Sequence, residues 1–367
     1  MSDVALADLG LGHLRIAEAY EGVPVSALGT EYGDPAGARL LREAVADWQG
    51  AEPDEVVITT GASLALVATL CSLPRPASIL VPRPHYPAYA QVAAILGIEV
   101  LTYELQRSRG WQPCAESVAE RVRPDTRAMV LNQPNNPTGS LVDLAVLRQL
   151  EELARASGLL VISDETYGEL VFDGASVPDM HSIFERSALV RILSFSKRFG
   201  MPGERLGCVI AEPTRGVEIS RAHWSLAMSP PATAQVIALS ALRSRPDRHV
   251  GALVEALARN RDRAIEILAE CDRLAFVPPV GGCFMWCEIV ESPIDSTSFA
   301  NRCRSSEGVN VTPGQAFGVD LPVFVRASFG VPGDELTTGL QRLVRAARNL
   351  DQVRFESRVP AVSAGGR

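Results

Sequence analysis

The sequence almost lacks lysine: of its 35 lysine and arginine residues, only Lys197 is a lysine. An arginine guanidinium stays protonated and cannot attack a carbonyl group. A primary amine that is buried near other cations can lose its proton and form a Schiff base. Lys197 directly follows Ser194–Ser196, which in turn follows the apolar segment Leu189–Leu193. We therefore expect Lys197 to be a nucleophile, because a surface charge could equally well be an arginine.

The sequence also lacks long apolar runs and an excess of positive charge. No apolar run reaches the about 20 residues needed to cross a bilayer, and residues 1–10 lack the basic start and apolar core of a secretory signal. The net charge of −8 argues against nucleic-acid and membrane partners. The seven cysteines are an odd number spread through apolar segments, which is typical of reduced thiols in a cytoplasmic protein.

Metal-binding patterns are missing as well. The five histidines have no ligand spacing. Cys283 and Cys287 lie in one apolar run, with no second pair of cysteines or histidines to complete a site. We therefore expect core packing for both cysteines and no metal.

The length of 367 residues predicts two lobes, because single cores stop growing beyond about 250–300 residues. Short apolar strands alternate with amphipathic helices, which predicts an α/β fold with a mainly parallel sheet. The expected strands are Val56–Thr59, Ser78–Val81, Glu99–Tyr103, Ala128–Leu131, Leu159–Ser163, Leu189–Leu193 and Cys208–Ile210. The expected helices lie near Ala36–Trp48, Leu64–Cys71, Pro87–Leu96, Leu144–Ala156 and Ala232–Arg243.

A long amphipathic helix over Asp247–Cys271 is expected to lead into a smaller α+β lobe. That lobe would contain strands Phe284–Ile289 and Val323–Ser328 and helices near Thr297–Ser305 and Glu335–Leu350. We expect a large domain over residues 25–245, a small domain over residues 1–24 and 246–352, and a flexible tail over residues 353–367.

Polar groups follow four of the expected strands at their carboxyl ends, which is where open α/β sheets bind ligands. These groups are Gly61–Ser63, Asn136–Gly139, Asp164–Tyr167 and Ser194–Lys197. A single such group would be ordinary loop composition. Four groups on one edge of a sheet predict a site.

Each group suits an aromatic aldehyde that carries a phosphate. Gly61–Ser63 at a helix start offers N–H groups and a helix dipole to a phosphate, and Arg205 could pair with the same anion. Taken alone, Gly61–Ser63 would be an ordinary turn at the start of a helix, and Arg205 would be a surface arginine. Asp164 ends a buried strand and needs a cationic partner, which a pyridinium N–H would supply. The alternative for Asp164 is a helix N-cap.

Together these residues resemble the fold-type I pyridoxal 5'-phosphate enzymes, specifically the class I/II aminotransferase superfamily. The resemblance extends from about Leu9 to Leu350. Its most specific parts are Asn135–Gly139, Ser163–Tyr167, and Ser194–Lys197 with Arg205, in the order and spacing of the family. It implies an aspartate aminotransferase-like fold, whose large domain holds a mainly parallel seven-stranded sheet sandwiched by helices.

The resemblance also implies roles for single residues. Lys197 would hold the cofactor as an aldimine and carry the proton of the substrate Cα, and Asp164 would bind the pyridine nitrogen. Tyr167 and Asn136 would hydrogen-bond the ring hydroxyl, and Tyr86 would stack on the ring. The phosphate would be held by Gly61, Ala62, Ser63, Ser194 and Arg205.

Two further residues match family positions. One contacts the cofactor phosphate in the partner subunit, and the other contacts the substrate. Tyr32 matches the tyrosine that reaches the phosphate of the neighbouring subunit, which implies a homodimer with shared sites. Arg326 matches the arginine that binds the substrate α-carboxylate, with Asn136 beside it. Little sequence precedes Leu9, where the family has a longer segment that covers the substrate pocket.

The leading functional hypothesis is a ping-pong aminotransferase that acts on small-molecule amino-acid and keto-acid substrates. The alternative is a lyase or cyclase with the same cofactor, because elimination and ring closure share the motifs and differ only beyond Cα. A third hypothesis, a transcriptional regulator, would need a basic helix-turn-helix domain, and the acidic composition argues against it. Release of a keto acid with amination of the cofactor would distinguish the first hypothesis from the second.

Overall fold

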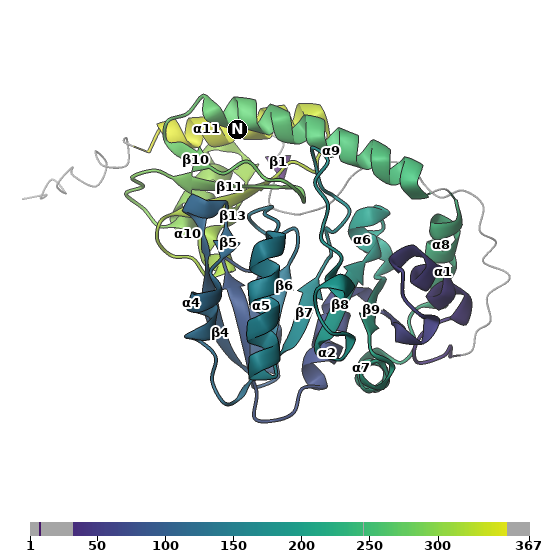
Figure 1. The fold of residues 1–367 in the computed structure, drawn as a ribbon. Coiled ribbons are helices and arrows are strands. Elements are labelled where there is room, and N and C mark those ends of the chain that lie inside the picture. Colours follow the sequence, from purple (N-terminus) through teal and green to yellow (C-terminus); the bar gives the residue numbers. More distant parts are fainter. Residues whose placement is uncertain (1–6, 9–31, 245, 351–367) are drawn as a thin grey trace, which may run out of the picture.

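The computed structural model describes residues 7–8, 32–244 and 246–350, and within the helix that begins at residue 246 it describes side chains from Val250 onward (Figure 1). Several expected segments lie outside the described residues. They are the tail over residues 353–367, residues 1–6, 9–24 and 351–352 of the small domain, and residues 25–31 and 245 of the large domain.

The large sheet has eight strands in the order β2-β9-β8-β7-β6-β3-β4-β5. The strands are β2 (Val56–Thr59), β3 (Ser78–Arg83), β4 (Glu99–Gln106), β5 (Gln112–Pro113), β6 (Thr126–Asn132), β7 (Leu160–Asp164), β8 (Leu189–Ser194) and β9 (Gly207–Ala211). Neighbours from β8 to β4 are parallel, β9 is antiparallel to β2 and β8, and β5 is antiparallel to β4. All seven expected strands are present. The sequence did not predict β5, because two residues carry no alternation that could be recognised.

Helices cover both faces of this sheet (Figure 1). They are α1 (Arg39–Gln49), α2 (Gly61–Cys71), α3 (Pro87–Ile95), α4 (Ala115–Ala119), α5 (Leu144–Ser157), α6 (Phe195–Arg198), α7 (Pro213–Ala227) and α8 (Ala232–Arg243). Successive side chains of a strand point to opposite faces. In β6, Ala128 and Val130 accordingly pack in the cluster of α2 and α3, whereas Met129 and Leu131 pack in the cluster of α5.

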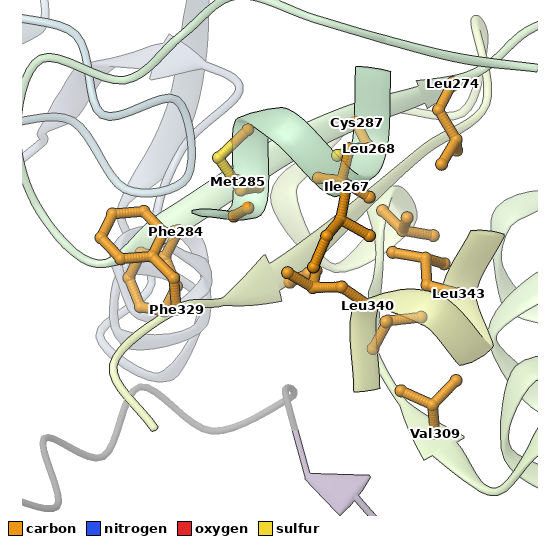
Figure 2. Packing of buried hydrophobic residues seen from close by; sticks show 14 of the residues in the cluster. Ile267, Leu268, Leu274, Phe284, Met285, Cys287, Val309, Phe329, Leu340 and Leu343 are labelled. Carbon is orange, nitrogen blue, oxygen red and sulfur yellow. The ribbon is translucent and has the colours of Figure 1, made fainter. Parts of the chain in front are cut away.

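A second sheet, of four antiparallel strands, has the order β10-β11-β14-β13. Its strands are β10 (Leu274–Phe276), β11 (Phe284–Ile289), β13 (Thr312–Pro313) and β14 (Phe324–Ser328). The long helix α9 (Pro246–Ala269) and α11 (Gly333–Arg348) lie side by side over it. Figure 2 shows Ile267 and Leu268 of α9 packed beside Leu340 and Leu343 of α11 and against strand residues such as Met285.

Short elements complete this lobe. Helix α10 (Ser296–Arg302) continues into a π-helical turn over Cys303–Glu307, so the helix expected near Thr297–Ser305 changes type within its range. Strand β1 (Ala7–Asp8) pairs in parallel with β12 (Val309–Asn310). The division into domains at residues 25, 246 and 352 stays a prediction.

Five chain segments that carry polar groups meet at one edge of the large sheet. The carboxyl ends of β6, β7 and β8 lie there because these strands are parallel. The carboxyl end of β2 joins them, because β2 and β8 are both antiparallel to β9. From the second sheet, β14 contributes Arg326 to the same edge.

Candidate active site

A cavity of about 350 Å³ lies at this edge of the sheet. Its lining includes ten of the residues that the sequence predicted for a site: Ala62, Ser63, Tyr86, Asn136, Asp164, Tyr167, Ser194, Lys197, Arg205 and Arg326. Two more lining residues, Thr166 and Ser196, lie within the selected segments but were given no role of their own. The sequence analysis did not select the remaining lining residues, which are Leu66, Asn132, Pro202 and Phe284.

Two predicted site residues lie outside the lining. Gly61 adjoins it, since a side chain there would lie 2.7 Å from an Arg205 guanidinium nitrogen. Tyr32 is 75% exposed, and its ring packs against Trp224 with the ring centroids 6.2 Å apart. Within one subunit, Tyr32 therefore does not contribute to this cavity.

Lys197 lies in α6, a single turn that follows β8 directly. The Ser194 side chain caps this turn by accepting a hydrogen bond from the Ser196 N–H at 3.2 Å. The Lys197 Nζ lies 5.6 Å from the centroid of the Tyr167 ring. Burial lowers the pKa of Lys197, and the charges of Arg326 and Arg205 lower it further, whereas Cys283 acts in the opposite direction. A neutral amine is therefore favoured more here than in water.

Asp164 is the last residue of β7 and is buried. Its Oδ2 accepts a hydrogen bond from the Tyr89 hydroxyl at 2.6 Å, and its Oδ1 accepts one from the Thr166 N–H at 3.0 Å. Burial raises the pKa of Asp164, while the hydrogen bonds from Thr166 and Tyr89 lower it. A cation against this carboxylate would favour its ionised form.

Asn132 ties the ends of β6 and β7 to the turn that carries Asn136. Its Nδ2 donates to the Asp164 carbonyl at 3.0 Å, and its Oδ1 accepts from the Asn136 N–H at 2.7 Å. The Asn136 Oδ1 then accepts a hydrogen bond from Arg326 at 2.9 Å. The two asparagines thus link the Asp164 strand to the arginine of the second sheet.

Arg326 is buried between two aromatic rings. The centroids of the Phe284 and Phe317 rings lie 4.0 Å and 5.0 Å from the guanidinium carbon. A second contact runs to the Thr312 hydroxyl at 3.4 Å. Burial lowers the pKa of Arg326. A planar guanidinium held in this way is suited to bind a carboxylate through two parallel hydrogen bonds.

The start of α2 forms a tight turn that suits an anion. The helix has no side-chain N-cap bond, so its first N–H groups are available to a ligand in the cavity. Gly61 has φ +79°, a conformation that favours glycine. A Cβ on Gly207, at the start of β9, would lie 2.6 Å from the Ala62 backbone nitrogen. Together with Arg205, this backbone cradle has the N–H groups and the positive charge that bind a phosphate.

Comparisons with known proteins show the family to which the chain belongs. The family model described as "Aminotransferase class I and II" matches residues 26–343. The chain belongs to this family. It is 32% identical over 333 residues to an arginine–pyruvate transaminase of Pseudomonas aeruginosa, covering 88% of this chain and 83% of the relative. It is 31% identical over 329 residues to an aspartate aminotransferase of Thermococcus kodakarensis, covering 90% and 83% of the two chains.

Solved structures of aminotransferases have the same fold. An aspartate aminotransferase double mutant of Thermus thermophilus superposes with a TM-score of 0.85 at 26% identity, over 93% of this chain and 92% of the other. An N-succinyldiaminopimelate aminotransferase of Mycobacterium tuberculosis gives a TM-score of 0.85 at 28% identity, over 93% of each chain. The aspartate aminotransferase-like fold and the aminotransferase activity expected from the sequence are thereby confirmed.

Aminotransferases of class I and II with this fold depend on pyridoxal 5'-phosphate, and the cavity has the donor set that this cofactor needs. It offers an amine with a lowered pKa in Lys197, a carboxylate in Asp164 and an uncapped helix start beside Arg205. In the described ranges, no three His, Cys, Asp or Glu side chains come close enough to hold a metal ion. No helix in the same ranges is long and apolar enough to span a membrane.

The aminotransferase site contains two buried polar residues that the sequence analysis missed. Tyr89 lies in the first turn of α3, three residues after the N-cap residue Tyr86, so this i, i+3 spacing was a usable signal that the two side chains are neighbours. Asn132 ends β6 and precedes the motif Asn135–Gly139 by only three positions. Both contact Asp164, which no local pattern in the sequence indicates.

Proposed function

We propose that this aminotransferase moves an amino group from an α-amino acid to a 2-oxo acid in two half-reactions, with Lys197 as the amine that carries the proton. The observation that supports this best is that Lys197, Asp164 and Arg326 line one cavity although they come from α6, the end of β7 and the middle of β14. Each has the charge and burial that its step requires.

In this proposal each part of the cofactor has its own contacts in the chain. Lys197 would hold the aldehyde carbon covalently, Asp164 would bind the pyridine nitrogen, and Tyr86 would lie against the ring. Tyr167 and Asn136 would bind the ring hydroxyl. The phosphate would lie on the start of α2 in contact with Gly61, Ala62, Ser63, Ser194 and Arg205. When bound, pyridoxal phosphate supplies an electron sink for the electron pair left on the substrate Cα.

Lys197 would remove and return the Cα proton through its Nζ. The lowered pKa favours the neutral amine that this role needs. The ring of Tyr167 lies beside Nζ, with its centroid 5.6 Å away. An arginine at position 197 would stay protonated and could not remove a proton.

Arg326 would bind the α-carboxylate and so select α-amino acids and 2-oxo acids over simple amines. Asn136 holds one guanidinium nitrogen, and the Phe284 ring fixes the guanidinium plane. The names of three relatives, an arginine–pyruvate transaminase, a valine–pyruvate aminotransferase and an aspartate aminotransferase, all specify α-amino acids. Because the side chains of arginine, valine and aspartate differ, these names support recognition of the shared α-carboxylate rather than of one particular amino donor.

The homodimer stays part of the proposal. Tyr32 is 75% exposed, and Leu226 and Met228 near the same surface are 50% and 38% exposed. The Gly33 N–H bonds the Ser229 hydroxyl at 3.1 Å, so the two segments lie together. This apolar surface supports contact with a second copy, whose site Tyr32 would complete. A cytoplasmic location is also proposed, supported by seven cysteines that are all unpaired thiols.

The test is a half-reaction with the holoenzyme and a panel of amino donors, without any 2-oxo acid. We expect one equivalent of 2-oxo acid per site, conversion of the cofactor to its aminated form, and recovery when a 2-oxo acid is added. A lyase or cyclase would return the aldehyde form and release a different product. Repeated turnover with donor alone would therefore contradict the proposed function.

A further inference from the structure

Asp164 receives a hydrogen bond from Tyr89, a tyrosine that does not line the cavity itself. Tyr89 is only 1% exposed and projects from α3 to the end of β7, where its hydroxyl lies 2.6 Å from the Asp164 Oδ2. Its ring packs edge-on against Tyr86, with the centroids 5.7 Å apart. The contact therefore joins the helix of the expected ring-stacking residue to the carboxylate.

The direction of this hydrogen bond is fixed by the chemistry of the two groups. A carboxylate can only accept, and the phenol is the donor. The other carboxylate oxygen already accepts the Thr166 N–H. Each oxygen thus has one donor from the protein and retains a lone pair for a further donor in the cavity that Asp164 lines.

We propose that Tyr89 is a positioning residue that keeps Asp164 ionised and oriented toward the ring nitrogen of the cofactor. The proposal rests on the role proposed above for Asp164. Burial alone favours the protonated carboxyl, because a charged group loses its hydration. A buried phenol that donates to the carboxylate offsets part of that penalty, since hydrogen bonds to charged groups are the stronger ones.

Loss of the Tyr89 hydroxyl should affect only the contact between Asp164 and the ring nitrogen of the cofactor. Without the Tyr89 hydroxyl, Asp164 more readily takes up a proton and then no longer favours a protonated ring. The phosphate contacts at α2 and the covalent link at Lys197 are not touched by this change. A ligand that has no ring nitrogen should therefore be insensitive to Tyr89.

Tyr103, in the sheet that also contains Asp164, provides a matched control. It is 2% exposed, lies on β4, and its hydroxyl donates to the Val130 carbonyl at 2.7 Å. Tyr103→Phe and Tyr89→Phe each remove one buried phenolic hydroxyl with a hydrogen bond of similar length. Only Tyr89 contacts the candidate site, so effects on folding common to both variants can be subtracted.

The experiment measures ligand affinity with the full-length chain freed of cofactor, without using turnover. Pyridoxamine 5'-phosphate and its 1-deaza analogue, which has carbon in place of the ring nitrogen, are titrated into the wild type, Tyr89→Phe, Tyr103→Phe and Asp164→Ala. We expect Tyr89→Phe to weaken pyridoxamine phosphate about tenfold, or about 1.4 kcal/mol, and the deaza analogue less than about twofold. Tyr103→Phe should leave both affinities within about twofold of the wild type.

The outcomes separate this inference from the proposal on which it rests. If Asp164→Ala loses the preference for the ring nitrogen but Tyr89→Phe retains it, Tyr89 has no positioning role. Equal weakening of both ligands in Tyr89→Phe would also overturn the inference, because it indicates a general packing defect. If Asp164→Ala itself retains the preference, the role of Asp164 is wrong.

A second variant covers the case that Tyr89→Phe does not fold. Replacement of Tyr89 by 3-fluorotyrosine retains the ring and makes the phenol a stronger donor. The preference for pyridoxamine phosphate over the deaza analogue should then increase. An unchanged or smaller preference would count against the inference.

Discussion

Replacing Arg326 by lysine changes the shape of the proposed carboxylate site while it retains the charge. The guanidinium is stacked 4.0 Å from the centre of the Phe284 ring and donates to Asn136 at 2.9 Å. A lysine ammonium has no planar fork, so one of two charge-assisted hydrogen bonds to the carboxylate is lost. Such a bond contributes about 2 kcal/mol. We therefore expect kcat/KM for an amino acid to fall about 30-fold.

The assay compares the best amino donor with the amine that lacks its α-carboxylate. Arg326→Lys should reduce the rate with the amino acid and leave the rate with the amine nearly unchanged. Arg261→Lys is the matched control, since Arg261 is 7% exposed, lies 4.8 Å from the Phe172 ring centroid and does not line the cavity. An equal loss with both substrates, or none with either, would refute the role of Arg326.

Two further predictions concern the start of α2. Gly207→Ala places a Cβ 2.6 Å from the Ala62 nitrogen. In denaturation and cofactor-binding measurements, this variant should lose about 1–3 kcal/mol of stability and bind the phosphate more weakly. Gly203→Ala is the control, because a Cβ there has no atom within 4 Å, and it should change neither measurement. The His223 Nε2 accepts the Thr60 N–H at 3.0 Å and must be unprotonated, and burial lowers the pKa of His223. Because the unfolded chain takes up this proton first, stability should fall as the pH drops below about 6.5. His223→Asn should make the Tm less dependent on pH between about 7.5 and 5.5, and an unchanged dependence would contradict this.

Much of the fold follows from local pattern. Strands β2 and β11 and helix α8 have the bounds that the sequence predicts, because apolar runs of the right length end at polar or turn-forming residues. Helix α7 was missed for a physical reason. Its apolar residues Val217 and Leu226 are each 50% exposed, whereas Ser220 and His223 are buried. Because these polar side chains share the inner face with the buried Ile219 and apolar ones lie on the outer face, the helical pattern in the sequence is weak.

The residues of the candidate site also fall into those that a local pattern predicts and those that it does not. Lys197, Asp164 and Asn136 could be predicted because each lies within five residues of the carboxyl end of a recognisable strand, and parallel strand ends meet at one edge. Tyr89 and Asn132 act through contacts between elements, which only the folded chain brings together. Tyr32 was predicted to serve a neighbouring subunit. That role stays a prediction, because its ring is exposed on the surface of a single chain.

The central claim is that the single lysine of this chain holds the cofactor covalently. Borohydride reduction of the holoenzyme, followed by trypsin digestion and mass spectrometry, tests it directly. Lys197 is the only lysine, so the amino terminus is the only competing primary amine. We predict one pyridoxyl group per chain in the peptide Ile192–Arg198, with cleavage after Lys197 blocked. An unmodified peptide, or an adduct at the amino terminus alone, would contradict the account.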